Sequence, residues 1–173
     1  MLENCCAFTG HRPHKFPWRY NETDSRCVAL KATLAEQIKA LTETGVTDYY
    51  SGGADSVDCW AALIVLELRK KNPALRLHCI LPYEGQADKW SNSAQERYRF
   101  IVEEANSVKY VSQKYYDGCM IDRNHRLVEA ADLLLAVYNG EQRGGTAATV
   151  RYARKLGHRI TILDPISLEI VKE

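Results

Sequence analysis

Two glycine pairs lie where the chain is expected to leave a strand and enter a helix. The apolar run 132–138 precedes one pair, and a helical pattern at 147–153 follows it. The other pair lies between a run ending at Tyr50 and a helical pattern beginning at Val57. Glycine lets a ligand approach the backbone, and the free N–H groups of a first helical turn attract an anion. The two turns predict a site for a phosphate-bearing ligand, formed by Ser51, Gly52, Gly53, Gly144, Gly145 and Thr146.

Charged residues near these turns are candidates for binding the same ligand or for acting on it. Gly10 and Arg12 follow an expected strand end, and both join the predicted ligand-binding residues. The guanidinium of Arg12 is placed for a bidentate phosphate contact. The alternative for Arg12 is a surface ion pair. Asp55 and Asp58 flank a helix start, where a carboxylate either stabilises the helix N-terminus or contacts a ribose hydroxyl. Arg123 lies in an expected helix and either points toward the ligand or lies on a solvated face.

Composition excludes several classes of protein and site. His11 and His14 are three residues apart, but no cysteine or histidine cluster accompanies them, so we predict no metal site. None of the six cysteines forms a C-x-x-C pair, which fits reduced thiols in a cytoplasmic protein. A net charge of +1 disfavours nucleic-acid binding. No apolar run reaches the roughly 20 residues that a membrane span needs.

Strand and helix patterns alternate along the whole chain. Strands are expected at 5–8, 47–50, 75–81, 108–111, 132–138 and 159–163. Helices are expected at 24–43, 57–68, from a capping box at Ser93 and Glu96 to 105, at 117–131 and at 146–156. This alternation predicts a single α/β domain over residues 1–173, with a Rossmann-like, doubly wound, mostly parallel sheet and helices on both faces.

A sheet of this kind binds its ligand outside the carboxyl ends of the strands. The polar and glycine-rich segments of the chain follow expected strands, so this one edge collects them. Gln86 follows the third strand and joins the predicted ligand-binding residues, and Glu84 beside it is a further carboxylate. Tyr83 and Trp90 have the rings to stack on a base, although a packing role at the core or rim is favoured for both.

The chain resembles the YpsA-like branch of the SLOG superfamily, which also contains the LOG phosphoribohydrolases and the DNA-processing protein DprA. The resemblance extends from about Cys6 to Leu163 and rests on five segments in order. These are residues 9–13 (Thr-Gly-His-Arg-Pro), 51–58 (Ser-Gly-Gly-Ala-Asp-Ser-Val-Asp), 82–86 (Pro-Tyr-Glu-Gly-Gln), 122–124 (Asp-Arg-Asn) and 144–146 (Gly-Gly-Thr). It implies a Rossmann-like domain that binds a nucleotide or a nucleotide-derived ligand.

One position departs from the LOG pattern. Thr149 stands where the LOG motif Gly-Gly-x-Gly-Thr-x-x-Glu has its glutamate, and threonine cannot act as a carboxylate acid or base. The proline before the first glycine of that motif is also missing. Arg123 matches the LOG arginine by position. The resemblance therefore implies that the phosphate-binding half is retained and that the catalytic half is not complete.

The leading hypothesis is a cytoplasmic protein that binds a small nucleotide or dinucleotide-like ligand as a sensor or regulator, with no other cofactor and no membrane partner. The runner-up is a nucleotide-processing hydrolase of the phosphoribohydrolase kind, which would use Asp58, Arg123 and Glu84. A DprA-like nucleic-acid-binding protein is a third alternative, disfavoured by the charge balance and the lack of a basic cluster. The resemblance is compatible with a homodimer, and the sequence leaves the oligomeric state open.

Overall fold

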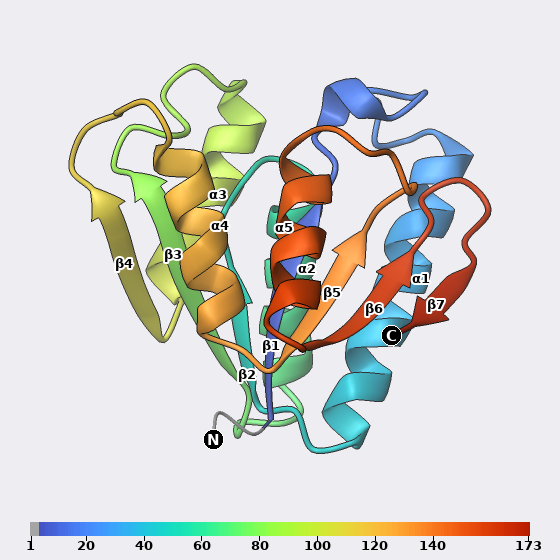
Figure 1. Ribbon diagram of the computed structural model, residues 1–173. Coiled ribbons are helices and arrows are strands. Elements are labelled where there is room, and N and C mark those ends of the chain that lie inside the picture. Colours follow the sequence, from blue (N-terminus) through green and yellow to red (C-terminus); the bar gives the residue numbers. More distant parts are fainter. Residues whose placement is uncertain (1–3) are drawn as a thin grey trace.

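The computed structural model describes residues 4–173 and contains one seven-stranded sheet in the order β4-β3-β2-β1-β5-β6-β7 (Figure 1). The strands are β1 Cys5–Gly10, β2 Asp48–Ser51, β3 Arg76–Tyr83, β4 Ser107–Ser112, β5 Leu133–Val137, β6 Arg159–Leu163 and β7 Ile170–Lys172. The helices are α1 Ser25–Glu43, α2 Val57–Arg69, α3 Asn92–Glu104, α4 Cys119–Glu129 and α5 Gly145–Lys155, with a short 3-10 helix, η1, at Pro13–Lys15.

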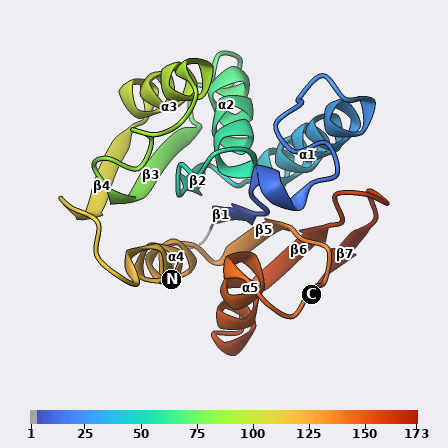
Figure 2. The same cartoon turned by 90° about the horizontal axis from the view of Figure 1, so that it is seen from above.

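Helices cover both faces of the sheet, as the alternating pattern predicts. Figure 2 shows α1, α2 and α3 on one face and α4 and α5 on the other. Each face has its own buried cluster: Leu30 and Leu34 of α1 belong to one, and Leu127 of α4 and Val150 of α5 to the other. The residues of β5 are all buried because helices lie on both sides of it. The Rossmann-like, doubly wound fold is therefore confirmed.

The strand order reverses between β1 and β5, and this reversal positions the site. From β1 the chain builds outward through β2, β3 and β4, and it then returns to β5 on the other side of β1. Adjacent strands from β4 to β6 are parallel. The loops that follow β1 and β5 consequently diverge to opposite faces, which opens a crevice at the carboxyl edge of the sheet. A backbone hydrogen bond of 3.2 Å from His11 N to Val137 O joins the two strand ends.

The structure adds two elements and corrects one helix start. η1 follows β1 directly, and β7 pairs antiparallel with β6. The capping box at Ser93 is wrong: α3 begins earlier, and its N-cap is Ser91, whose hydroxyl accepts a hydrogen bond from Ala94 N. The side chain of Gln95 donates to the carbonyl oxygens of Asp88 and Trp90, which fixes this earlier entry. Across residues 4–173, we find no helix long and apolar enough to span a bilayer.

Candidate ligand-binding site

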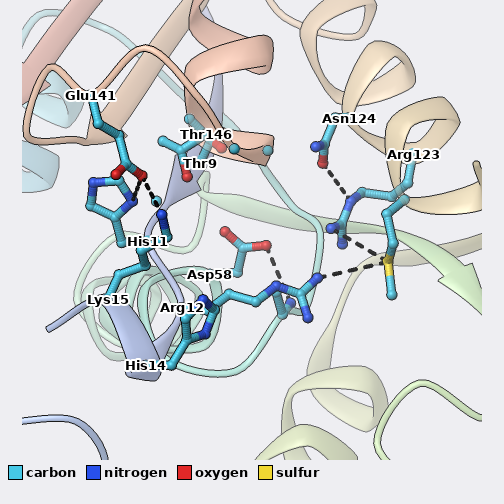
Figure 3. A pocket seen from close by; sticks show the side chains of 15 residues that line it. Thr9, His11, Arg12, His14, Lys15, Asp58, Arg123, Asn124, Glu141 and Thr146 are labelled. Atoms are coloured by element: carbon cyan, nitrogen blue, oxygen red, sulfur yellow. Dashed lines mark hydrogen bonds and ion pairs between the residues drawn. The ribbon is translucent and has the colours of Figure 1, made fainter.

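A cavity of about 310 Å³ opens at the strand-order reversal, between the loops that follow β1 and β5 (Figure 3). Its size is at the lower end of the range of small-molecule sites. Four segments that are distant in sequence supply its wall, which consists of Thr9, Gly10, His11, Arg12, His14, Lys15, Ala54, Asp58, Met120, Arg123, Asn124, Glu141, Gly144, Gly145 and Thr146. The cavity therefore collects seven of the predicted site residues: Gly10, Arg12, Asp58, Arg123, Gly144, Gly145 and Thr146.

The start of α5 forms one side of this cavity and is open to it. The N-cap is Gly144, whose φ of +103° is a backbone conformation that favours glycine, and no side chain caps the helix. Thr146 is the second residue of the helix, so its hydroxyl does not occupy the N-cap position. Without a capping side chain, the first-turn N–H groups face the cavity with the positive end of the helix dipole.

Two arginine side chains meet at the opposite side of the cavity. Arg12 Nη2 lies 3.7 Å from the sulfur of Met120, and Arg123 Nη2 lies 4.0 Å from the same atom (Figure 3). Arg123 is only 3% exposed, so the alternative of a solvated helix face is wrong for this residue. Arg12 is half-buried, and the proximity of these two cations has an electrostatic cost, which an anion in the cavity would offset.

Arg123 is held in place by the first glycine turn. Its Nη1 donates to Gly52 O at 2.5 Å, and its Nε donates to Asn124 Oδ1 at 2.8 Å. A Cβ on Gly52 would lie 2.6 Å from Arg123 Nη1 and 2.9 Å from Asp58 Oδ2. Gly52 is thus required because Arg123 and Asp58 occupy the space that any side chain would need.

Asp58 is the buried carboxylate of the cavity. Its Oδ2 accepts a hydrogen bond of 3.2 Å from Ala54 N, in the turn before α2. Burial raises the pKa of Asp58, and the positive charge of Arg123 opposes that increase. Burial likewise lowers the pKa of the Arg123 guanidinium, and the charge of Asp58 opposes that decrease. The two groups therefore depend on each other for charge compensation in a region largely closed to water.

Three predicted site residues support this turn from behind and do not line the cavity. Ser51 Oγ donates to Asp58 O at 3.0 Å and accepts from Gly53 N at 3.2 Å. The Nε2 atom of Gln86 donates to the carbonyl oxygens of Gly52 and Gly53 at 3.4 and 3.3 Å. Ser51, Gly53 and Gln86 are buried, so the structure places them as a scaffold for the turn.

The remaining carboxylates lie away from the cavity wall. Asp55 forms an ion pair with Arg97 at 2.7 Å, and Arg97 forms a second ion pair with Glu22. Burial raises the pKa of Glu22, but hydrogen bonds from Lys31 and Arg97 outweigh it and leave the pKa below its usual value. Glu84 is exposed and lies beside a separate cavity near α3, so it is not brought together with Asp58 and Arg123.

Sequence reasoning did not select four ionisable residues of the wall: His11, His14, Lys15 and Glu141. Lys15 Nζ donates to Glu141 Oε1 at 2.8 Å, and this hydrogen bond lowers the pKa of Glu141. His11 is buried and its Nε2 accepts from Asn139 N at 3.2 Å, while burial lowers its pKa. Their position in the sequence could have identified them, because all four follow the carboxyl ends of β1 and β5. No group of three or more metal-binding side chains occurs within residues 4–173.

Thr149, at the position of the LOG glutamate, does not face the cavity. It is 2% exposed, and its hydroxyl donates to Gly145 O at 2.8 Å, one turn back in α5. This is the local back-bonding expected of threonine within a helix. The structure therefore provides no acid or base at this position.

Gly10 has a packing function as well as a place in the wall. A Cβ on Gly10 would lie 2.5 Å from Cγ1 of Val57, the first residue of α2. The end of β1 and the start of α2 approach each other this closely only because residue 10 has no side chain. Ser56, immediately before α2, has a φ of +80° and donates its hydroxyl to His11 O at 3.3 Å. The turns after β1 and β2 are therefore directly connected.

Comparisons with known proteins agree with this fold. A UPF0398 protein of Halalkalibacterium halodurans is 26% identical over 173 residues, covering 96% of this chain and 91% of that protein. A UPF0398 protein of Bacillus thuringiensis (strain Al Hakam) is 29% identical over 154 residues, covering 87% of this chain and 83% of that protein.

Among solved structures, DNA processing protein A (DprA) of Streptococcus pneumoniae matches with a TM-score of 0.60 and 13% identity. The match covers 94% of this chain but only 52% of the DprA chain, so this chain spans about half of that protein. The likeness at this identity is one of fold. The family model YpsA, described as the YspA SLOG family, matches residues 6–167. The chain therefore belongs to the YspA SLOG family.

Proposed function

We propose that this protein binds a small phosphorylated ligand derived from a nucleotide, with the phosphate at the N-terminus of α5. One observation carries the proposal: an uncapped helix start and two arginines converge on the same cavity of about 310 Å³. A helix N-terminus and guanidinium groups are complementary to phosphate in charge and in hydrogen-bond geometry. Their placement at the strand-order reversal also fits the general location of ligands in open α/β sheets.

The charges of the wall favour an anion. Arg12, Lys15 and Arg123 contribute three cations, while Asp58 and Glu141 contribute two carboxylates. Lys15 already pairs with Glu141, which leaves two guanidinium groups against Asp58 alone. A phosphate would compensate this excess, and the Asp58 carboxylate has the acceptor atoms that a ribose hydroxyl needs.

A thermal-shift titration tests the proposal. A ligand at 100 times its Kd stabilises the folded state by about 2.7 kcal/mol. For a chain of this size, that gain raises the Tm by about 5–10 °C. We expect such a shift from at least one member of a panel of nucleoside mono- and diphosphates and dinucleotides, and no shift from the corresponding nucleosides.

Two matched pairs of variants locate the binding. Gly145→Asp places a carboxylate at the helix start, where the nearest atom to its Cβ would be 3.9 Å away, so the variant is expected to fold and to lose the shift. Ala148→Asp adds the same charge at an exposed position of α5 outside the wall and should retain it. Lys15→Ala should weaken binding, whereas Arg143→Ala, an exposed cation outside the wall, should not. Equal shifts in Gly145→Asp and wild type would refute the assignment.

A second candidate function is hydrolysis of an N-glycosidic bond, and the buried carboxylate of Asp58 favours it. A carboxyl group with a raised pKa in a cavity is a candidate general acid. Against it, Thr149 supplies no carboxylate near the ribose. We expect negligible release of free base from nucleoside monophosphates, measured by chromatography. Turnover that Asp58→Asn abolishes would establish the enzyme and displace the binding-protein proposal.

A further inference from the structure

A second cavity, of about 390 Å³, lies next to the first and shares two of its residues, Arg12 and His14. The rest of its wall comes from the segment after β1, from Asp55 before α2, and from the turn that leads into α3. Like the first cavity, it is at the lower end of the size range of small-molecule sites. Two adjacent cavities that share a wall provide space for a ligand with two chemically different parts.

The two walls differ in chemistry. The first has the open helix start and most of the charged groups, whereas the second has the aromatic side chains Tyr20 and Trp90. Trp90 packs against Tyr98 with ring centroids 5.4 Å apart and planes at 80°, which fixes the indole in position. Tyr20 is 72% exposed, so most of its ring is accessible. Accessible aromatic rings beside a cavity are suited to stacking on a planar base.

Arg12 stands at the junction of the cavities. It lines both, and its guanidinium lies against Met120 on the side of the first cavity (Figure 3). A ligand that occupied both cavities would pass this residue, with its negative end toward α5. The segment that carries Tyr20 is fixed nearby, because Glu22 in the same segment accepts hydrogen bonds from Trp60 and Arg97.

We infer that a single nucleotide binds across both cavities, with its phosphate at the start of α5 and its base against Tyr20 and Trp90. This inference rests on the proposed function, because it requires the phosphate site. It assigns the second cavity as the base subsite. Trp90 is therefore interpreted as a ligand contact rather than only the rim aromatic that the sequence favours.

Isothermal titration calorimetry with matched ligands tests this inference. The probes are ribose 5-phosphate, which has no base, and the four 5′-nucleoside monophosphates. We expect at least one nucleotide to bind about tenfold or more tightly than ribose 5-phosphate, because stacking strengthens the binding of each base. Tyr20→Ala and Trp90→Ala should each weaken the binding of that nucleotide about fivefold or more and leave the Kd of ribose 5-phosphate unchanged.

The controls separate stacking from folding and from the phosphate site. Trp90→Phe should keep most of the affinity for the nucleotide. Tyr115 is an exposed tyrosine outside both cavities, and Tyr115→Ala should leave the Kd of both ligands unchanged. Because Tyr20 is largely exposed, Tyr20→Ala is expected to fold even if Trp90→Ala does not. Equal affinity for ribose 5-phosphate and every nucleotide, or weaker binding of both ligand types in Tyr20→Ala, would overturn the base subsite and leave the proposed function standing. Absence of binding by all five probes would overturn the base subsite, and absence of a thermal shift across the wider panel of nucleotides and dinucleotides would overturn the proposed function as well.

Discussion

Replacing Gly52 by alanine tests whether the first glycine turn is shaped by its neighbours. The new Cβ would lie 2.6 Å from Arg123 Nη1 and 2.9 Å from both Arg123 Cδ and Asp58 Oδ2. Ordinary van der Waals contact begins at 3.4 Å, so Arg123 has to move, although it is buried and bonded to Gly52 O. Overpacking costs about 1–3 kcal/mol. Loss of a hydrogen bond from a charged donor costs about 1.5–3 kcal/mol.

The two costs overlap because they concern one side chain, so we expect Gly52→Ala to lower the free energy of unfolding by about 2–4 kcal/mol. At about 2–4 °C per kcal/mol, the Tm falls by roughly 5–15 °C, which differential scanning calorimetry measures directly. Gly145→Ala is the matched control. The nearest atom to a Cβ at residue 145 would be Asn124 Nδ2, 3.9 Å away, which is ordinary van der Waals contact. Alanine in this helical position should raise stability by about 0.5–1 kcal/mol. A Tm within 2 °C of wild type for Gly52→Ala would refute the placement of Arg123.

Three further predictions concern other parts of the site. Gly10→Ala should lower the Tm because the new Cβ overlaps the side chain of Val57. In a double-mutant cycle, Val57→Ala should reduce the loss of stability that Gly10→Ala causes, and additive effects of the two substitutions would contradict the contact. Because burial lowers the pKa of His11 in the folded state, the stability that its neutral form provides is present above about pH 6.5 and is lost as the pH falls. Thermal melts from pH 7.5 to 5.5 should therefore show a smaller decline for His11→Gln than for wild type, and His14→Gln, at an exposed position, should decline like wild type. Thr149→Glu should lower the Tm by burying a carboxylate, without release of free base in a chromatographic assay; a stable variant that released base would contradict the orientation of residue 149.

The fold was predictable because its signals are local. Helices such as α1 and α5 repeat their apolar residues at helical spacing, and strands such as β5 are short apolar runs, so each element is visible within its own segment. The alternation of these elements then fixes the parallel topology. β7 was missed because three residues are too few to show a period, and η1 has no apolar repeat.

The two glycine turns looked equivalent in the sequence, but their surroundings differ. Gly144 and Gly145 border an open cavity, where the nearest neighbours of an added Cβ are at 3.5 Å or more. Gly52 instead fits against Arg123, which comes from α4, 71 residues further along the chain. Contacts between such distant segments leave no periodic trace in one sequence. For the same reason the ion pair between Asp55 and Arg97 could not be anticipated.

The antiparallel strand β7 has a consequence for how this protein behaves in concentrated solution. β6 carries buried apolar residues such as Ile160 and Leu163, and without β7 its outer backbone groups would form an unpaired edge. Such an edge is a template for strand addition by another molecule, the first step of aggregation. β7 covers that edge, and an ion pair of 2.7 Å between Glu173 and Arg154 anchors it to α5. β7 is then the outer strand at this end of the sheet, and its length of 3 residues offers little backbone for strand addition. At the other end the outer strand is β4, where exposed Lys109 opposes intermolecular pairing by its charge.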